Sequence, residues 1–330
     1  MSVVNRCANI YEFAADEGGA VPYIRKRRSR NLQILIYHRV NDEGDRFFPA
    51  IPIDVFAQQM EYLASYWNVL PLEDAVERVT RKDVPDNAIA ITFDDGYRDN
   101  FLHAFPILKK LSLPATIFLA TEVIGTGRTL WHDRVFSAFR ETRRPSLIGI
   151  PSENDRYDLS TLASKLATQE KILRFIWSLG EDDRTRWIQC LTEKLQVPDR
   201  QHVSKLMLTW DEIRFMHGQG ISFGAHTVTH PILSKLPSHR ALEELQQSKA
   251  TIERELQAPV RTFAYPIGRR EDYDEGTKRL VREVGYICAL TTVPGTNMDN
   301  ADPYELRRAT PWDQDIAAFA IRLNYFKIAS

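Results

Sequence analysis

The chain has 330 residues, 43% of them hydrophobic and 26% charged, which is typical of a folded enzyme with a sizeable core. A formal net charge of −1 argues against nucleic acid as the main partner. The three cysteines are odd in number and form no Cys-x-x-Cys pair, so we expect reduced, mostly buried thiols. We find no secretory signal and no window apolar enough for a transmembrane segment, and therefore expect a cytoplasmic protein.

Residues 1–30 are expected to form an N-terminal extension outside the main core. The extension ends in a dense basic run, Arg-Lys-Arg-Arg-Ser-Arg, at residues 25–30. The simpler interpretation of this run is a solvated arm. The functional alternative is a peripheral contact with anionic lipid or with a phosphorylated carrier.

Short apolar segments then alternate with amphipathic segments along much of the chain. We predict strands at 32–37, 69–71, 88–93 and 115–120, and helices at 54–65, 72–80 and 100–111. The alternation resumes near Thr209, with strands at 221–225, 260–265 and 286–291 and helices between them. Such an order favours a parallel α/β sheet or barrel.

The alternation is interrupted between about residues 121 and 205, where the chain is charged and its later half has helical spacing. We interpret residues 126–205 as an inserted helical subdomain. Residues 31–125 and 206–330 would then form one barrel.

Polar candidates for a site directly follow the predicted strands. Because the carboxyl ends of barrel strands meet on one face, residues distant in sequence are expected to share a site there. The candidates are His38, Asp94, Asp95, His226, His230 and Tyr265.

Two adjacent carboxylates, Asp94 and Asp95, end the strand at 88–93. They repel each other, and a divalent cation would hold one ionised and lower the pKa of the other. The simpler alternative is a helix N-terminus, where Asp is common. Gly96 permits a tight turn close to a ligand, and the Tyr97 amide is then available to donate to an oxyanion.

Two histidines, His226 and His230, share a short loop after a predicted strand, and Pro231 argues against a helix there. Taken alone, they are as consistent with hydrogen-bonding loop histidines as with metal ligands. Together with Asp95 they form an Asp-His-His set that suits Zn²⁺ or another divalent metal with open positions.

Three segments resemble signature motifs of the polysaccharide deacetylases, the NodB-homology group related to carbohydrate esterase family 4. Residues 92–96 (Thr-Phe-Asp-Asp-Gly) and 226–230 (His-Thr-Val-Thr-His) are similar to the first two motifs, and residues 263–268 (Phe-Ala-Tyr-Pro-Ile-Gly) to the third. The resemblance covers about 32–125 and 206–310. It implies a distorted (β/α) barrel of the TIM-like kind, a catalytic divalent metal, and hydrolysis of an N-acetyl group on a sugar.

The motif positions imply roles for individual residues. Asp94 would be the general base, and Tyr97 would lend its amide to the oxyanion. Asp95, His226 and His230 would hold the metal, most simply Zn²⁺, with Co²⁺ or Ni²⁺ as alternatives.

Substrate-binding residues are predicted from the third motif and from the start of the insertion. Tyr265 and Pro266 belong to that motif, and Trp131 is of a type that stacks on sugar rings. For Trp131 the simpler alternative is a packing role, and its neighbour His132 is a candidate only for an assisting role.

The sequence departs from the family pattern at the arginine that many members place before the Tyr-Pro of the third motif. Phe263 and Ala264 stand there instead. Arg269, Arg307 and Arg308 are the candidates to replace it, and the sequence does not choose among them.

A second departure concerns the general acid. The Leu-x-His of many members corresponds here to Leu-Arg-Arg at residues 306–308, and no histidine follows His239. Tyr37-His38 resembles an element of the permuted poly-N-acetylglucosamine deacetylase branch, which places the acid N-terminally. Imidazole has a suitable pKa for that role, so we expect His38 to be the acid, the alternative being a buried strand-end histidine.

These observations lead to an expected function in exopolysaccharide or cell-envelope biosynthesis, namely removal of N-acetyl groups from an aminosugar-containing glycan or its precursor. One alternative is a deformylase or another amide hydrolase acting on a lipid-linked or nucleotide aminosugar. A less favoured one is a non-catalytic glycan-binding protein, which would have no need of a base at Asp94.

Overall fold

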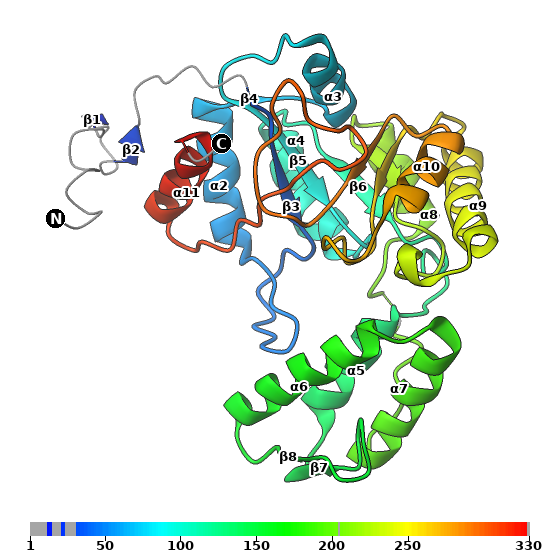
Figure 1. Ribbon diagram of the computed structural model, residues 1–330. Coiled ribbons are helices and arrows are strands. Elements are labelled where there is room, and N and C mark those ends of the chain that lie inside the picture. The colour runs from blue at the N-terminus through cyan, green and yellow to red at the C-terminus, as the bar shows by residue number, and fades with distance from the viewer. Residues whose placement is uncertain (1–11, 15–20, 24–30, 204, 329–330) are drawn as a thin grey trace, which may run out of the picture.

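The computed structural model describes residues 12–14, 21–23, 31–203 and 205–328 (Figure 1). The basic run at 25–30, with its predicted lipid contact, lies outside these residues. Within the N-terminal extension, β1 (Glu12–Ala14) pairs antiparallel with β2 (Val21–Tyr23). Among the described helices, none combines the length and the apolar character needed to cross a membrane.

A parallel sheet forms the centre of the molecule, and its strands are largely buried because helices cover them. Its strand order is β11-β10-β9-β6-β5-β3, and a short β4 also pairs with β5. This arrangement confirms the predicted α/β barrel class. The strands are β3 (Gln33–Tyr37), β4 (Asn68–Val69), β5 (Ala88–Phe93), β6 (Thr116–Leu119), β9 (Ser222–Ala225), β10 (Thr262–Ala264) and β11 (Cys288–Leu290).

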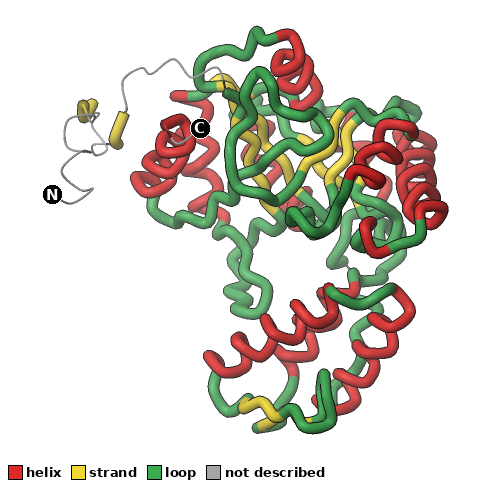
Figure 2. The backbone as a smooth tube through the Cα atoms, viewed as in Figure 1, coloured by secondary structure: helices red, strands yellow, loops and turns green. Residues whose placement is uncertain are grey.

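Helices surround the sheet on its outer side (Figures 1 and 2). Their apolar faces pack against the strands in two hydrophobic clusters, because each helix carries a stripe of buried side chains. They are α2 (Ile53–Tyr66), α3 (Leu72–Arg81), the π-helical turn η1 (Asn100–Ala104), α4 (Phe105–Lys110), α8 (Trp210–His217), η2 (Leu233–Lys235), α9 (Ser238–Leu256), α10 (Glu275–Glu283) and α11 (Ile316–Ile328).

A short extended segment between β11 and α11 joins the two edges of the sheet. The Leu306 amide donates to Ala289 in β11 at 3.0 Å, and the Leu306 oxygen accepts from Thr291, just after β11, at 2.8 Å. Ala309 exchanges bonds of 2.8 and 3.1 Å with β3. Arg308 lies between these two anchors. The closure therefore carries this arginine into the barrel interior, although the segment itself is not a predicted strand.

The inserted segment contains three helices and a hairpin, which lie to one side of the barrel (Figure 2). The later two helices match the predicted helical spacing, whereas the first helix and the hairpin were not predicted. The segment packs around a hydrophobic cluster of its own, which includes Val135, Phe139, Ile172 and Ile188. The elements are α5 (Trp131–Glu141), β7 (Ser146–Ile148), β8 (Arg156–Asp158), α6 (Leu162–Trp177) and α7 (Glu181–Leu195).

The two described cysteines should differ in reactivity. Cys288 is buried in β11, and burial raises the pKa of its thiol to about 12, whereas Cys190 is only partly buried. Because the thiolate is the reactive form, iodoacetamide at pH 8 is expected to label Cys190 and to spare Cys288. Peptide mapping checks this, with the unfolded chain as control. Equal labelling of both cysteines in the folded protein would contradict it.

Candidate active site

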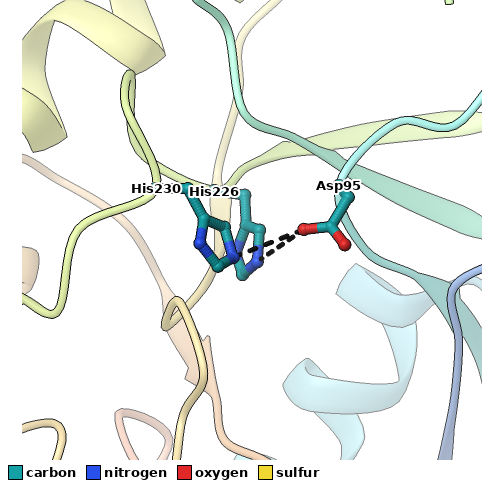
Figure 3. Close-up of side chains that lie close together, drawn as sticks. All are labelled: Asp95, His226 and His230. Atoms are coloured by element: carbon teal, nitrogen blue, oxygen red, sulfur yellow. Dashed lines mark ion pairs between the residues drawn. The ribbon is translucent and has the colours of Figure 1, made fainter. Parts of the chain in front are cut away.

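The carboxyl ends of β5 and β9 bring the three predicted metal ligands together (Figure 3). The Nε2 atoms of His226 and His230 lie 3.6 and 3.3 Å from Oδ1 of Asp95. One potential ligand atom from each residue falls within 4.8 Å of the others, and all three residues are buried. The side chains therefore converge on one point, as expected for ligands of a single ion.

The donor set fits a divalent metal. Oδ1 of Asp95 is buried and has no hydrogen-bond partner among the described residues. Burial raises the pKa of Asp95 well above its usual range, and the charges of Asp94 and Asp133 raise it further. A buried carboxylate without compensation is costly, and a cation held by one carboxylate and two imidazoles would compensate it.

The protein also prepares the histidines for a metal. Nδ1 of His226 donates to the backbone oxygen of Ala264 at 2.7 Å, which leaves the lone pair of Nε2 directed to the ligand side. Burial lowers the pKa of His226, and burial with the neighbouring imidazoles lowers the pKa of His230 well below its usual value. Both rings are therefore neutral at pH 7, the form that binds metal.

Backbone strain accompanies these ligands. Asp95 has φ 75° and His230 has φ 58°, in the left-handed region that non-glycine residues seldom adopt. Each such residue costs roughly 1–3 kcal/mol, and such strain clusters at functional sites. The loop conformations are therefore maintained by surrounding contacts rather than by local preference.

Glu244 supplies one of these contacts from α9. Its buried carboxylate accepts hydrogen bonds from the amides of Val228 and Thr229 at 2.7 and 3.0 Å, and from the Thr229 hydroxyl at 2.9 Å. It thus holds the loop between His226 and His230. The sequence did not single out Glu244, because a glutamate on an amphipathic helix has no distinguishing local pattern.

Replacing Glu244 by Ala is expected to weaken Zn²⁺ binding by about 10–100-fold, because loss of an outer contact lets the ligand loop relax. Calorimetric titration of metal-free protein measures the effect. Glu243→Ala is the matched control, since Glu243 is partly exposed on the same helix and pairs only with Arg240 in the contacts described. Equal affinities for the two variants would show that the loop keeps its geometry without Glu244.

Asp94 is held by a buried arginine, Arg308. Two parallel bonds of 2.7 Å join Nη1 and Nη2 of Arg308 to the two carboxylate oxygens of Asp94, and Nε of Arg308 donates to the oxygen of Thr291 at 2.7 Å. Burial by itself raises the pKa of Asp94, but the charge and hydrogen bonds of Arg308 lower it overall. Of the three candidate arginines, Arg308 forms the ion pair with Asp94, whereas Arg269 pairs with Asp272.

His38 lines the same cavity as Asp94 and the ligands. The side-chain amide of Asn100 donates to its backbone oxygen at 2.9 Å and fixes the end of β3. Burial lowers the pKa of His38 to about 4, although the charge of Asp94 opposes this. The ring is therefore neutral at pH 7 in the resting enzyme.

The Tyr97 amide has a geometry suited to an external acceptor. Gly96 oxygen accepts from the Leu208 amide, and the Arg98 amide donates to Leu206 oxygen, both at 2.9 Å. In an antiparallel pair, such flanking bonds turn the amide of the intervening residue away from the partner strand. Gly96 has φ 84°, which permits the turn that precedes Tyr97.

His132, which the sequence marked only as an assisting residue, is placed within the site. Its Nε2 lies 3.8 Å from Oδ2 of Asp95 and 3.0 Å from the Tyr97 hydroxyl. That hydroxyl donates its proton to Asp133 at 2.8 Å, so the proton between His132 and Tyr97 comes from His132. Burial lowers the pKa of His132 to about 3. The helix α5 thus ties the insertion to the barrel at the ligand site.

The predicted substrate-binding side chains do not line this cavity. The Tyr265 hydroxyl donates to the backbone oxygen of Tyr304 at 3.0 Å, and Pro266 is buried beside it. Trp131 is also buried, and its Nε1 donates to the oxygen of His230 at 3.2 Å. In this structure Tyr265, Pro266 and Trp131 pack in the interior, and Trp131 supports the loop that carries His230.

The cavity above the ligands has a volume of about 140 Å³. Its floor consists of the polar residues described above. Its other walls are mainly apolar and come from the loop after β3, the insertion and the third-motif loop. These wall residues are Phe48, Phe136, Leu173, Trp177 and Ile267.

Comparisons with known proteins concern the family and the fold. A family model described as polysaccharide deacetylase matches residues 81–289. The protein YxkH of Bacillus subtilis is 23% identical over 288 residues, covering 87% of this chain and 73% of that protein. The poly-beta-1,6-N-acetyl-D-glucosamine N-deacetylase of Staphylococcus epidermidis is 26% identical over 172 residues, covering 51% of this chain and 58% of that protein.

A solved structure shares the fold. The Streptococcus pyogenes deacetylase PplD, in complex with acetate, matches with a TM-score of 0.58 at 20% identity, over 85% of this chain and 92% of that chain. At this identity the likeness concerns the fold, and it agrees with the barrel predicted from the motifs.

Proposed function

Because this chain belongs to the polysaccharide deacetylase family, we propose that it is a metal-dependent hydrolase that removes N-acetyl groups from an aminosugar-containing glycan or glycan precursor. The observation that carries the proposal is the Asp95, His226 and His230 cluster next to an Asp94 held by Arg308. A pure binding protein would need no such base, so this arrangement argues against a non-catalytic role. Exopolysaccharide or cell-envelope assembly is the corresponding process.

A divalent metal in this cluster, with Zn²⁺ first and Co²⁺ or Ni²⁺ as alternatives, would lower the pKa of a water molecule and polarise the acyl carbonyl. The protein's own contribution begins with Asp94. Its Oδ2 lies 4.0 Å from Nε2 of His226, and its lowered pKa keeps it ionised, so it is available to take a proton from the attacking water. The Tyr97 amide would donate to the oxyanion that develops on the former carbonyl oxygen.

His38 would return a proton to the leaving amine. Its lowered pKa means that the ring is neutral at rest and must acquire this proton during the reaction. Asp94 lines the same cavity and holds the proton taken from water, so we assign it as the source. Proton transfer from Asp94 through His38 to nitrogen balances the hydrolysis, with acetate and a free amine as products.

The apolar walls favour acetyl over formyl substrates. Phe136, Leu173 and Trp177 offer hydrocarbon surface to the acyl group, and burying one methyl group there is worth about 0.8 kcal/mol. A formyl group has no methyl to bury. We therefore keep deformylation of a lipid-linked or nucleotide aminosugar as the second candidate only.

Acetate release from N-acetylglucosamine oligomers tests the proposal. Enzyme treated with a chelator is expected to be inactive, and addition of Zn²⁺ or Co²⁺ should restore release. Release that persists without metal would contradict the metal-dependent mechanism. Formate release from N-formyl analogues without acetate release would favour the second candidate, and sugar binding without turnover would favour a binding protein.

Replacing His38 by Gln is expected to lower kcat on N-acetylated sugars by about 10²-fold, since protonation of the amine is lost. The variant should retain most of its activity on 4-nitrophenyl acetate, whose leaving group departs without a proton. Steady-state kinetics on both substrates measure the difference. An equal loss on both substrates would indicate a structural role for His38.

A further inference from the structure

The inserted segment supplies a roof over the candidate active site. Phe136 comes from α5, and Leu173 and Trp177 come from α6; all three line the cavity that contains the metal ligands. Phe48 and Ile267, from the loops after β3 and β10, complete the apolar walls. We use the name roof for Phe136, Leu173 and Trp177.

The size of the cavity limits what can enter. Its volume is about 140 Å³. Pockets for drug-sized ligands usually measure roughly 300–1,000 Å³. A cavity of about 150 Å³ holds one benzene ring. The space therefore suits an acyl group with part of one sugar ring. The other residues of a longer substrate would have to lie outside this space.

The outer edge of the roof is fastened to the barrel. The guanidinium of Arg269, in the third-motif loop, lies over the ring of Trp177 at 4.6 Å. On the other side, the side-chain amide of Gln169 in α6 donates to the backbone oxygen of Phe47 at 2.8 Å. These contacts reach loops on two sides of the cavity, so α6 is held across it.

The inner edge is fastened as well. Trp131 donates to the backbone of His230, and Asp133 accepts from the Tyr97 hydroxyl, so α5 contacts two of the motif loops. The ring of Phe136 stacks on that of Phe48 at 4.6 Å. Both edges of the roof are therefore attached to loops of the barrel in this structure.

We propose that the roof makes the enzyme select an N-acetylated aminosugar at an end of its substrate and exclude residues in the interior of a polymer. The inference rests on the proposed deacetylase function. An interior residue carries a sugar on both sides and needs a groove open in both directions. A terminal residue, whether on a glycan or on a carrier, needs only one opening. Leu173 and Trp177 are thus assigned as specificity-determining residues.

The test uses the metal-loaded full chain and a β-1,6-linked N-acetylglucosamine pentamer, with tandem mass spectrometry to locate each deacetylated residue. The wild type is expected to prefer a terminal residue over interior residues by about tenfold or more, a difference that a steric block readily produces. Leu173→Ala combined with Trp177→Ala should reduce this preference to near unity. Leu173→Ala alone, which keeps the Arg269 contact, should reduce it in part.

Leu162→Ala is the matched control, because Leu162 is 41% exposed at the start of the same helix. It should keep the wild-type pattern, and thermal melting verifies that each variant folds. Deacetylation spread evenly along the pentamer by the wild type would overturn the inference alone. An unchanged terminal preference in the double variant would overturn the role of the roof. Failure to release acetate from both the pentamer and N-acetylglucosamine would overturn the proposed function and this inference together.

Discussion

Asp94→Asn is expected to lower kcat for acetate release by about 10³–10⁴-fold while the protein still binds Zn²⁺. The amide has nearly the shape of the carboxylate but cannot accept the proton of the attacking water. It still offers Arg308 one oxygen acceptor, but it removes the charge of the pair, so thermal melting must first show that the variant folds. The measurement is steady-state kinetics on protein whose metal content has been determined by elemental analysis.

Asp95→Asn provides the comparison for this prediction. Its carboxylate lies among the ligand nitrogens, so the variant should lose metal and activity together. The two adjacent residues would then differ in a single readout, the amount of metal retained. Near-wild-type turnover by metal-loaded Asp94→Asn would refute the assignment of the base.

Arg308→Met is expected to destabilise the protein by about 3–5 kcal/mol at pH 7, because it leaves the Asp94 carboxylate buried without its partner. Denaturant unfolding measures this loss. Arg307→Met is the matched control: Arg307 is its exposed neighbour on the same segment, and a surface substitution changes stability by about 0.5 kcal/mol or less. Equal losses of unfolding free energy in the two variants would contradict the role of Arg308 as the partner of Asp94.

Arg308→Met is also expected to change how the stability and the reaction rate depend on pH. In the wild type the lowered pKa of Asp94 contributes stability that is present above its unfolded pKa of about 3.9 and is lost as pH falls through the lower folded value. Without Arg308, burial dominates and raises the folded pKa. The variant should then lose stability as pH rises above about 3.9, and the acid limb of its pH–rate profile should move to higher pH. An unmoved acid limb would show that Asp94 is not the titrating base.

The local sequence was sufficient to predict the strands and the polar side chains that follow them. An apolar run followed by Asp94 and Asp95 predicts a buried strand with two carboxylates at its end. The pair His226 and His230 predicts a ligand loop in the same way. The structure brings Asp95 and these two histidines together, because parallel strands in one barrel end on the same face.

Residue type alone does not decide between a surface role and a core role. Tyr265 and Trp131 are types found both at sugar-binding surfaces and in protein cores, and both are buried here. His132 had no partner within its own segment, yet α5 carries it to the Tyr97 hydroxyl. In each case the decisive neighbour lies on another element, so the local pattern contains no information about it.

The sequence by itself determined the barrel class, the family and the residues of the first two motifs, since each depends on short spacings along one segment. Only the tertiary structure decided which arginine holds Asp94, because Arg308 is 214 positions away and reaches it through the segment that closes the barrel. It also decided that Glu244 braces the ligand loop and that residues of the inserted segment line the cavity. These contacts arise from how separate elements pack. Burial makes an unpaired charge costly, so each partner matters only once the chain has folded.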